Sequence, residues 1–204
     1  MTDSAAADMR HAERLTGQVL SASPRNPRGH LAKGLLLRAQ NRFEEAIEEF
    51  ERALESNNNW AGVIGLVGQC KLLIGSLSEA IPLLERAIRL SPRDPLLCAF
   101  YWRIGLVHLL QSQTDEAIIW LEKARNTCVE HPLPHAYLAS AYALKSDTKR
   151  AALELREARR LSGDNRYSSL VRLRTVGAFQ AAKIRSLAEA TYFVGLRKAG
   201  MPGE

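Results

Sequence analysis

Apolar residues along this chain recur with the spacing of amphipathic helices, and one short apolar pattern returns four times. Each copy has an alanine, a large apolar residue four positions later and another alanine three positions after that. The leading alanines, separated by 34, 37 and 34 residues, are Ala46, Ala80, Ala117 and Ala151. Twelve residues before each of them stands a small residue, in order Gly34, Gly68, Gly105 and Ala139. The pattern therefore predicts a repeated unit of amphipathic helices that bury their apolar faces against neighbouring units.

Turn-forming residues stand between the small residue and the leading alanine of each copy and divide each unit into a pair of predicted helices. They are Asn41-Arg42, Gly75-Ser76, Ser112-Gln113 and Ser146-Asp147. Ser23-Pro24 and Ser91-Pro92 fit the boundaries between pairs, because proline stops a helix there. A weaker copy of the pattern, with Ala12, Thr16 and Val19, stands 34 residues before the first strong one. We therefore expect a partial unit ahead of four complete ones.

This register resembles the tetratricopeptide repeat, a helix–turn–helix unit with small residues where its two helices cross. The resemblance covers roughly residues 10–162 and implies an all-α fold, a right-handed α-solenoid with a concave, partner-binding surface. One departure is at the fourth position of the repeat, where the family's aromatic residue is replaced by His30, Ile64 and His135, with Tyr101 as the exception. A second is the three extra residues before the third repeat, around Pro95.

The repeat register divides the chain into three parts. We expect a flexible N-terminus over residues 1–9, a solenoid over 10–162 and a C-terminal helical cap over 163–204. After the partial first repeat, the complete repeats are expected at about 27–60, 61–97, 98–131 and 132–165. The last helix is expected from Ser186 to Ala199, because Ser186 and Glu189 have the spacing of a capping box. This helix would either cap the final repeat or fold back into the concave groove.

Composition supports a soluble, folded protein, with 25% charged and 46% hydrophobic residues. The longest stretch without a charge, from Ser56 to Cys70, is too short to span a membrane, and the acidic N-terminus does not resemble a secretory signal. The three cysteines, Cys70, Cys98 and Cys128, form no CxxC motif, so we expect them to pack as small apolar groups in a reducing compartment. These features favour a cytoplasmic location.

The resemblance places partner-facing residues on the first helix of each repeat. Carried over by register, they are Arg28, Leu31, Leu35, Arg38, Leu66, Gln69, Leu72, Trp102, Arg103, Leu106, Leu109, Ala136, Tyr137, Ser140 and Leu144. They describe an apolar groove edged by Arg28, Arg38 and Arg103, which suits an amphipathic helix or an extended apolar peptide. Trp102 and Tyr137 would be its anchors, and about half of the leucines would instead pack between helices. We therefore expect a protein or peptide partner, with a homodimer through an exposed end of the solenoid as a further option.

The sequence contains few residue patterns that are typical of catalysis, cofactor binding or metal binding. The chain has no GxxxxGK[ST], GxGxxG or HExxH motif and no Ser–His–Asp spacing, so no catalytic residue, cofactor or metal site is predicted. Gly62, Gly65 and Gly68 lie inside one predicted helix, where packing explains them better than a phosphate loop does. His131 and His135 are close in sequence, but no further metal ligand stands near them. The chain is therefore expected not to be an enzyme.

Two alternatives remain beside protein binding. The stretch from Tyr192 to Glu204, and Phe100-Tyr-Trp-Arg-Ile-Gly105, resemble the accessory repeat region of bacterial class III adenylate/guanylate cyclases. That resemblance implies a regulatory or dimerising arm in bacterial signalling, without the catalytic domain. The other alternative is nucleic-acid binding, because 13 of the 28 Lys and Arg but only 6 of the 22 Asp and Glu lie in residues 145–204, in a chain of net charge +6. The basic surface would be formed by Lys149, Arg150, Arg156, Arg159 and Arg160. Without a recognition motif or stacking aromatics, a solvated face or a dock for an acidic partner is favoured over nucleic acid.

Overall fold

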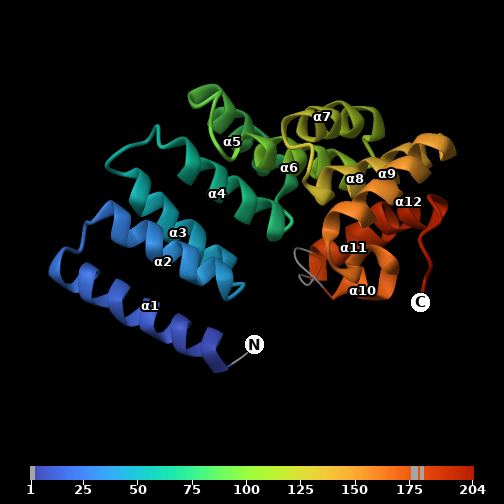
Figure 1. Cartoon of the computed structure of the whole chain (residues 1–204). Helices are drawn as coiled ribbons and strands as arrows, with labels where there is room; N and C mark the ends of the chain where they lie inside the picture. The colour runs from blue at the N-terminus through green and yellow to red at the C-terminus, as the bar shows by residue number, and fades with distance from the viewer. Residues whose placement is uncertain (1–2, 176–178, 180–181) are drawn as a thin grey trace. The chain divides into compact units, whose positions relative to one another are not determined.

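The structure is a computed structural model that describes residues 3–175, 179 and 182–204. Every regular element within these residues is a helix, which confirms the predicted all-α class (Figure 1). The chain forms two compact units, an N-terminal unit of Met1–Ser91 and a C-terminal unit of Pro92–Glu204. The division falls where the three extra residues interrupt the repeat spacing.

The N-terminal unit consists of five helices that pack in chain order (Figure 1). They are α1 (Asp3–Ala22), α2 (Pro27–Ala39), α3 (Phe43–Leu54), α4 (Ala61–Leu73) and α5 (Leu77–Leu90). The start of α2 is fixed locally, because the Asn26 side chain accepts a hydrogen bond from the Gly29 amide and Pro27 supplies a helical φ. Residues 3–9, for which flexibility is expected, lie within α1.

The core of this unit follows the repeat pattern. Ala46, Phe50 and Ala53 are fully buried in α3 and pack with residues of α2 and α4. Gly34 faces the Phe50 ring so closely that a Cβ atom there would lie 2.5 Å from it. The small residue of the first helix thus makes room for the large residue of the second, as the resemblance to the tetratricopeptide repeat implies.

The same backbone turn joins the two helices of every complete repeat. Its central residue has a positive φ at the same register position each time, in Asn41 (61°), Gly75 (81°), Ser112 (61°) and Ser146 (63°). Left-handed backbone suits glycine and asparagine, whereas serine adopts it at some cost. The turn residues identified in the sequence therefore mark the helix boundaries correctly.

The C-terminal unit contains the third and fourth repeats and the helices that come after them. The repeats are formed by α6 (Leu97–Leu110), α7 (Thr114–Thr127), α8 (Pro132–Leu144) and α9 (Thr148–Ser162), and the remaining elements are the 3-10 helix η1 (Asn165–Ser168), α10 (Leu170–Arg174), α11 (Ala182–Ala190) and α12 (Tyr192–Lys198). The expected single helix from Ser186 is wrong, because α11 begins before Ser186 and ends at Ala190. Glu189 does not complete a capping box but binds the Arg174 guanidinium at 2.6 Å, which ties α11 to α10.

A disulfide joins Cys98, in the first turn of α6, to Cys128, the residue after α7. Their Cα atoms lie 6.0 Å apart, within the range that a disulfide spans. The prediction that these two cysteines pack separately is wrong, because a helical hairpin brings the start of its first helix beside the end of its second. Cys70 alone behaves as expected, since it is a free thiol buried in the N-terminal core. Because two of the three cysteines form a disulfide, the cysteines give no support to a cytoplasmic location.

Candidate functional site

In the N-terminal unit, the predicted partner-facing residues of α2 and α4 form what we call the α2–α4 face, defined by Leu31, Leu35, Arg38, Leu66 and Gln69. Leu31 and Leu66 are half-buried against the core, whereas Leu35 is 36% exposed. The Arg38 guanidinium donates a 2.8 Å hydrogen bond to the Gln69 side-chain carbonyl, which links the two helices. This face therefore combines accessible apolar surface with a positioned arginine.

Two other residues predicted for this groove lie at opposite extremes of exposure. Arg28 is exposed on α2, one turn before Leu31. Leu72 is only 2% exposed and therefore belongs to the core rather than to a contact surface. The spacing alone could not separate these cases, because a solenoid helix packs on several sides.

In the C-terminal unit, the predicted residues form the α6–α8 face, defined by Trp102, Arg103, Tyr137 and Ser140. The Arg103 guanidinium lies 4.7 Å from the centre of the Trp102 ring, and the Trp102 and Tyr137 rings are 6.0 Å apart. Tyr137 and Ser140 are 3% and 0% exposed, so they are not open contact residues. Leu106, Leu109 and Ala136 are likewise buried, and Leu144 is half-buried.

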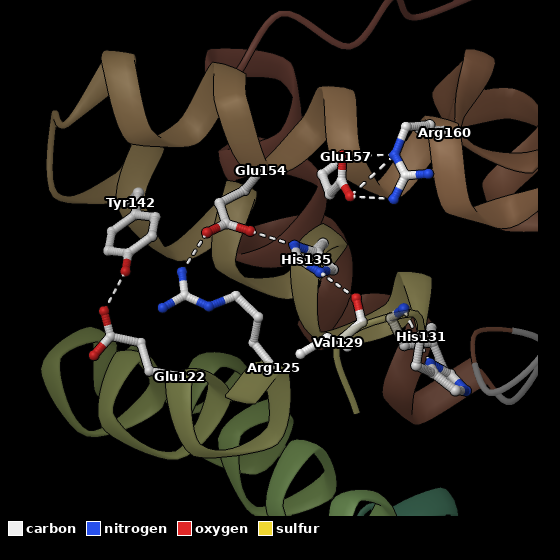
Figure 2. Close-up of polar contacts among 10 residues, drawn as sticks. Glu122, Arg125, Val129, His131, His135, Tyr142, Glu154, Glu157 and Arg160 are labelled. Atoms are coloured by element: carbon white, nitrogen blue, oxygen red, sulfur yellow. Dashed lines mark hydrogen bonds and ion pairs between the residues drawn. The ribbon is translucent and has the colours of Figure 1, made fainter. Parts of the chain in front are cut away.

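A polar network that the sequence reasoning missed connects α7, α8 and α9 (Figure 2). Arg125 donates to one oxygen of the Glu154 carboxylate at 2.6 Å, and His135 Nδ1 lies 2.6 Å from the other. His135 Nε2 faces the Val129 carbonyl oxygen at 3.4 Å. The Glu154 side chain is only 12% exposed, so its carboxylate is hydrogen-bonded by these two neighbours instead of being solvated by bulk water.

The edge of the same network holds a second carboxylate contact. Tyr142 donates a hydrogen bond to Glu122 at 2.5 Å (Figure 2). The Arg150 guanidinium lies over the Tyr142 ring at 4.2 Å. Burial first, and then the bond to Glu122, raise the pKa of Tyr142 to about 12. The phenol therefore stays neutral and acts as a structural donor.

The N-terminal unit repeats the histidine arrangement in its first complete repeat. His30 Nδ1 lies 2.7 Å from the Glu49 carboxylate, and Nε2 lies 2.9 Å from the Pro24 carbonyl oxygen. Each histidine stands at the fourth repeat position, six residues after its carbonyl partner and 19 before its glutamate. The signal for this network was thus present in the sequence, as the two histidines that replace the family's aromatic residue.

Glu49 gives this unit a predicted sensitivity to acid. Its side chain is 4% exposed. Besides the contact with His30, the Glu49 carboxylate forms ion pairs with Lys33 Nζ at 2.8 Å and with the Arg52 guanidinium at 2.5 Å. Burial raises the pKa of the carboxyl, but the hydrogen bonds from Lys33 and His30 outweigh it, and the net pKa lies below the ordinary 4.5. A carboxyl with a lowered folded-state pKa stabilises the fold above pH 4.5 and loses that contribution as the pH falls through its folded-state pKa.

We therefore expect the free energy of unfolding to fall more steeply between pH 5 and about pH 3 in the wild type than in Glu49→Gln. Chemical denaturation at each pH, followed by circular dichroism, measures this difference. The exposed Glu51→Gln on the same helix is the matched control and should keep the wild-type slope. Parallel slopes for the wild type and Glu49→Gln would contradict the assignment.

The predicted basic surface on α9 is partly neutralised by its own neighbours. Arg150 pairs with Asp147, Arg160 pairs with Glu157, and Arg159 donates to the Tyr167 carbonyl oxygen at 3.0 Å. Lys149 and Arg156 are exposed. Three of the five residues thus hold local structure, which weakens the case for a nucleic-acid surface.

His131 and His135, the pair considered for a metal, have separate protein contacts. His131 precedes α8 and its Nδ1 accepts a hydrogen bond from the Leu133 amide at 3.3 Å. Burial first, and then the charge of Arg166, lower the pKa of His131. No group of three metal-ligating side chains occurs in the part of the chain that the structure describes. Among the same residues, no helix has both the length and the hydropathy needed to cross a bilayer.

Comparisons with known proteins agree with the repeat register. Residues 27–60 and residues 74–132 each match a family model described as "Tetratricopeptide repeat". The first of these ranges coincides with the repeat predicted from the alanine spacing. The Cell division cycle protein 27 homolog of Caenorhabditis elegans is 31% identical over 117 residues, which cover 57% of this chain but only 14% of that protein.

Solved structures show the same fold at low sequence identity. PilF of Pseudomonas aeruginosa superposes with a TM-score of 0.72 at 20% identity, covering 95% of this chain and 85% of that one. MamA superposes with a TM-score of 0.66 at 23% identity, covering 78% of this chain and 91% of that one. None of these similarities links the chain to nucleotide cyclases, so the cyclase resemblance gains no support from them.

Proposed function

Because the chain carries tetratricopeptide repeats, we propose that it is a non-catalytic interaction scaffold that binds a peptide or helix of a protein partner. The binding site in this proposal is the α2–α4 face of the N-terminal unit. The observation that supports it most is Leu35, a large apolar side chain 36% exposed between half-buried Leu31 and the Arg38–Gln69 pair.

The chemistry of this face favours an amphipathic ligand. Leu31, Leu35 and Leu66 offer apolar contact, and Arg28 and Arg38 place positive charge at its edge. An arginine held by an amide side chain needs little reordering before it meets a carboxylate or a carbonyl of the partner. We infer that the partner segment is apolar along one side and acidic or rich in free carbonyls beside it.

Substituting Leu35 with glutamate should weaken partner capture at least tenfold, because a carboxylate would be desolvated at the centre of the contact. Affinity capture from lysate of the source organism, quantified for wild type and variant side by side, measures the loss. Leu153→Glu is the matched control, since Leu153 is 54% exposed on α9 of the other unit. Equal capture by the wild type and Leu35→Glu would disprove the site.

A cytoplasmic location and homodimer formation, both expected from the sequence, stay predictions. Sedimentation at several protein concentrations tests self-association directly. Since no observation on the α2–α4 face favours a cyclase arm or a nucleic-acid site, neither is proposed as a second function.

A further inference from the structure

The C-terminal helices do not extend the stack of helix pairs in the C-terminal unit. α12 packs mainly on α8, and α11 touches α6, so both lie against the first helices of the two repeats. α9, the second helix of the last repeat, is contacted instead by η1. A helix that continued the repeat would pack on α9 as α8 packs on α7. The C-terminal helices therefore cover the face on which the repeat register places partner contacts.

The contact between α12 and α8 is close enough to involve their backbones. Ser140 Oγ donates a 2.9 Å hydrogen bond to the Tyr192 carbonyl oxygen at the start of α12. Three residues later, a Cβ atom on Gly195 would lie 2.5 Å from the Ser140 carbonyl oxygen. Because that oxygen belongs to the backbone, it cannot move aside, and glycine is required at this crossing point.

Aromatic rings also hold the start of α12. The Tyr192 ring meets the Tyr137 ring edge to face at 5.0 Å, and Phe179 stacks on Tyr192 at 5.2 Å. Tyr192 and Phe193 are fully buried. The α6–α8 face thus holds a helix by a serine hydroxyl, a close glycine crossing and an aromatic cluster.

The contact between α12 and the α6–α8 face leaves one polar group unpaired. The hydroxyl group of Tyr192 is buried and has no hydrogen-bond partner among the described residues. Burying a hydroxyl without a partner opposes the seating of its side chain. The apolar contacts of α12 are thus offset in part, which suits a ligand that can be exchanged.

We propose that the α6–α8 face is a helix-binding site, that α12 is its built-in ligand, and that an external helix with the same pattern competes for the seat. The pattern is the one that α12 presents, namely two aromatic residues followed by glycine and leucine, as in Tyr192, Phe193, Gly195 and Leu196. This site lies in the C-terminal unit and is separate from the α2–α4 face of the proposed function.

The test uses the full chain and a fluorescent synthetic peptide of residues 182–204. Gly195→Val should release α12 through its clash with the Ser140 backbone and leave the α6–α8 face intact. We expect this variant to bind the native-sequence peptide at least tenfold more tightly than the wild type does, by fluorescence anisotropy. A peptide that itself carries Gly195→Val should bind neither chain.

Two further variants keep the test decisive if Gly195→Val does not fold. Tyr192→Ala removes the aromatic contact instead of adding a clash and should also open the site, whereas the exposed Arg197→Ala should behave as wild type. Folding is followed by circular dichroism. If folded variants bind the peptide no better than the wild type, or if every α12 variant unfolds, α12 is a structural part of the unit and the proposal is overturned. Leu35→Glu, in the other unit, should leave peptide binding unchanged, so the two proposals fail independently.

Discussion

Replacement of Glu154 by leucine should lower the free energy of unfolding by about 2–4 kcal/mol, since it leaves one buried and one half-buried hydrogen-bond donor without their anion. Arg125 and His135, 29% and 9% exposed in their side chains, both point toward this carboxylate (Figure 2). Removing one partner of a fully buried ion pair costs about 3–5 kcal/mol of stability, and the partial exposure of Arg125 reduces that cost. Urea denaturation with an unchanged m-value measures the effect.

The chain offers a matched control one helical turn away. Glu157 also lies on α9 and also binds a guanidinium, that of Arg160, but this pair is on the surface (Figure 2). Exposed pairs contribute little, because water solvates both partners once they separate. Glu157→Leu should therefore leave stability almost unchanged. If the two substitutions cost the same, the buried network does not hold α7, α8 and α9 together.

The fold could be predicted from sequence because the close crossing within each repeat depends on two residues at a fixed spacing. Gly34 and Phe50, or Gly105 and Leu121, are a small and a large residue 16 positions apart that fill one gap, so this spacing, together with its resemblance to the tetratricopeptide repeat, identifies the helix pair. The segment after the last repeat has no such register. The break between α11 and α12 lies at Thr191, where a run of β-branched, aromatic and glycine residues has weak helix propensity but does not fix the point at which a helix ends. Tyr192 and Gly195 contact Ser140 of α8 directly after this break.

The candidate site was predictable only in part, since a helix register gives a direction and not an exposure. It places Leu35 and Tyr137 alike on the inner side of a first helix, yet one is accessible and the other lies under α12. The Cys98–Cys128 disulfide was missed for a related reason, because the pairing depends on which helix ends meet. The His30 and His135 networks could have been found, as both glutamates stand at the same distance in the sequence.

Gly105→Val should destabilise the C-terminal unit by roughly 2–3 kcal/mol through overpacking at the crossing of α6 and α7. A Cβ atom at this position would lie 2.6 Å from Leu121 Cγ and 3.3 Å from the Ala117 carbonyl oxygen. Leu121 is completely buried and the oxygen belongs to the backbone, so neither neighbour can move away cheaply. Thermal and urea unfolding of the variant measure the loss.

Gly62→Ala is the control that separates crowding from the general effect of replacing a helical glycine. Gly62 lies in α4, where a Cβ atom would have no neighbour within 4 Å, so alanine there should stabilise the helix by about 0.5–1 kcal/mol. The opposite signs are expected mainly because the Cβ position is crowded at Gly105 and has no neighbour at Gly62. A double variant, Gly105→Val with Leu121→Ala, should lose at least about 1 kcal/mol less than the sum of the single changes, since the cavity accepts the added methyl groups. Additive losses would mean that Gly105 is required for some reason other than the close crossing of the two helices of the repeat.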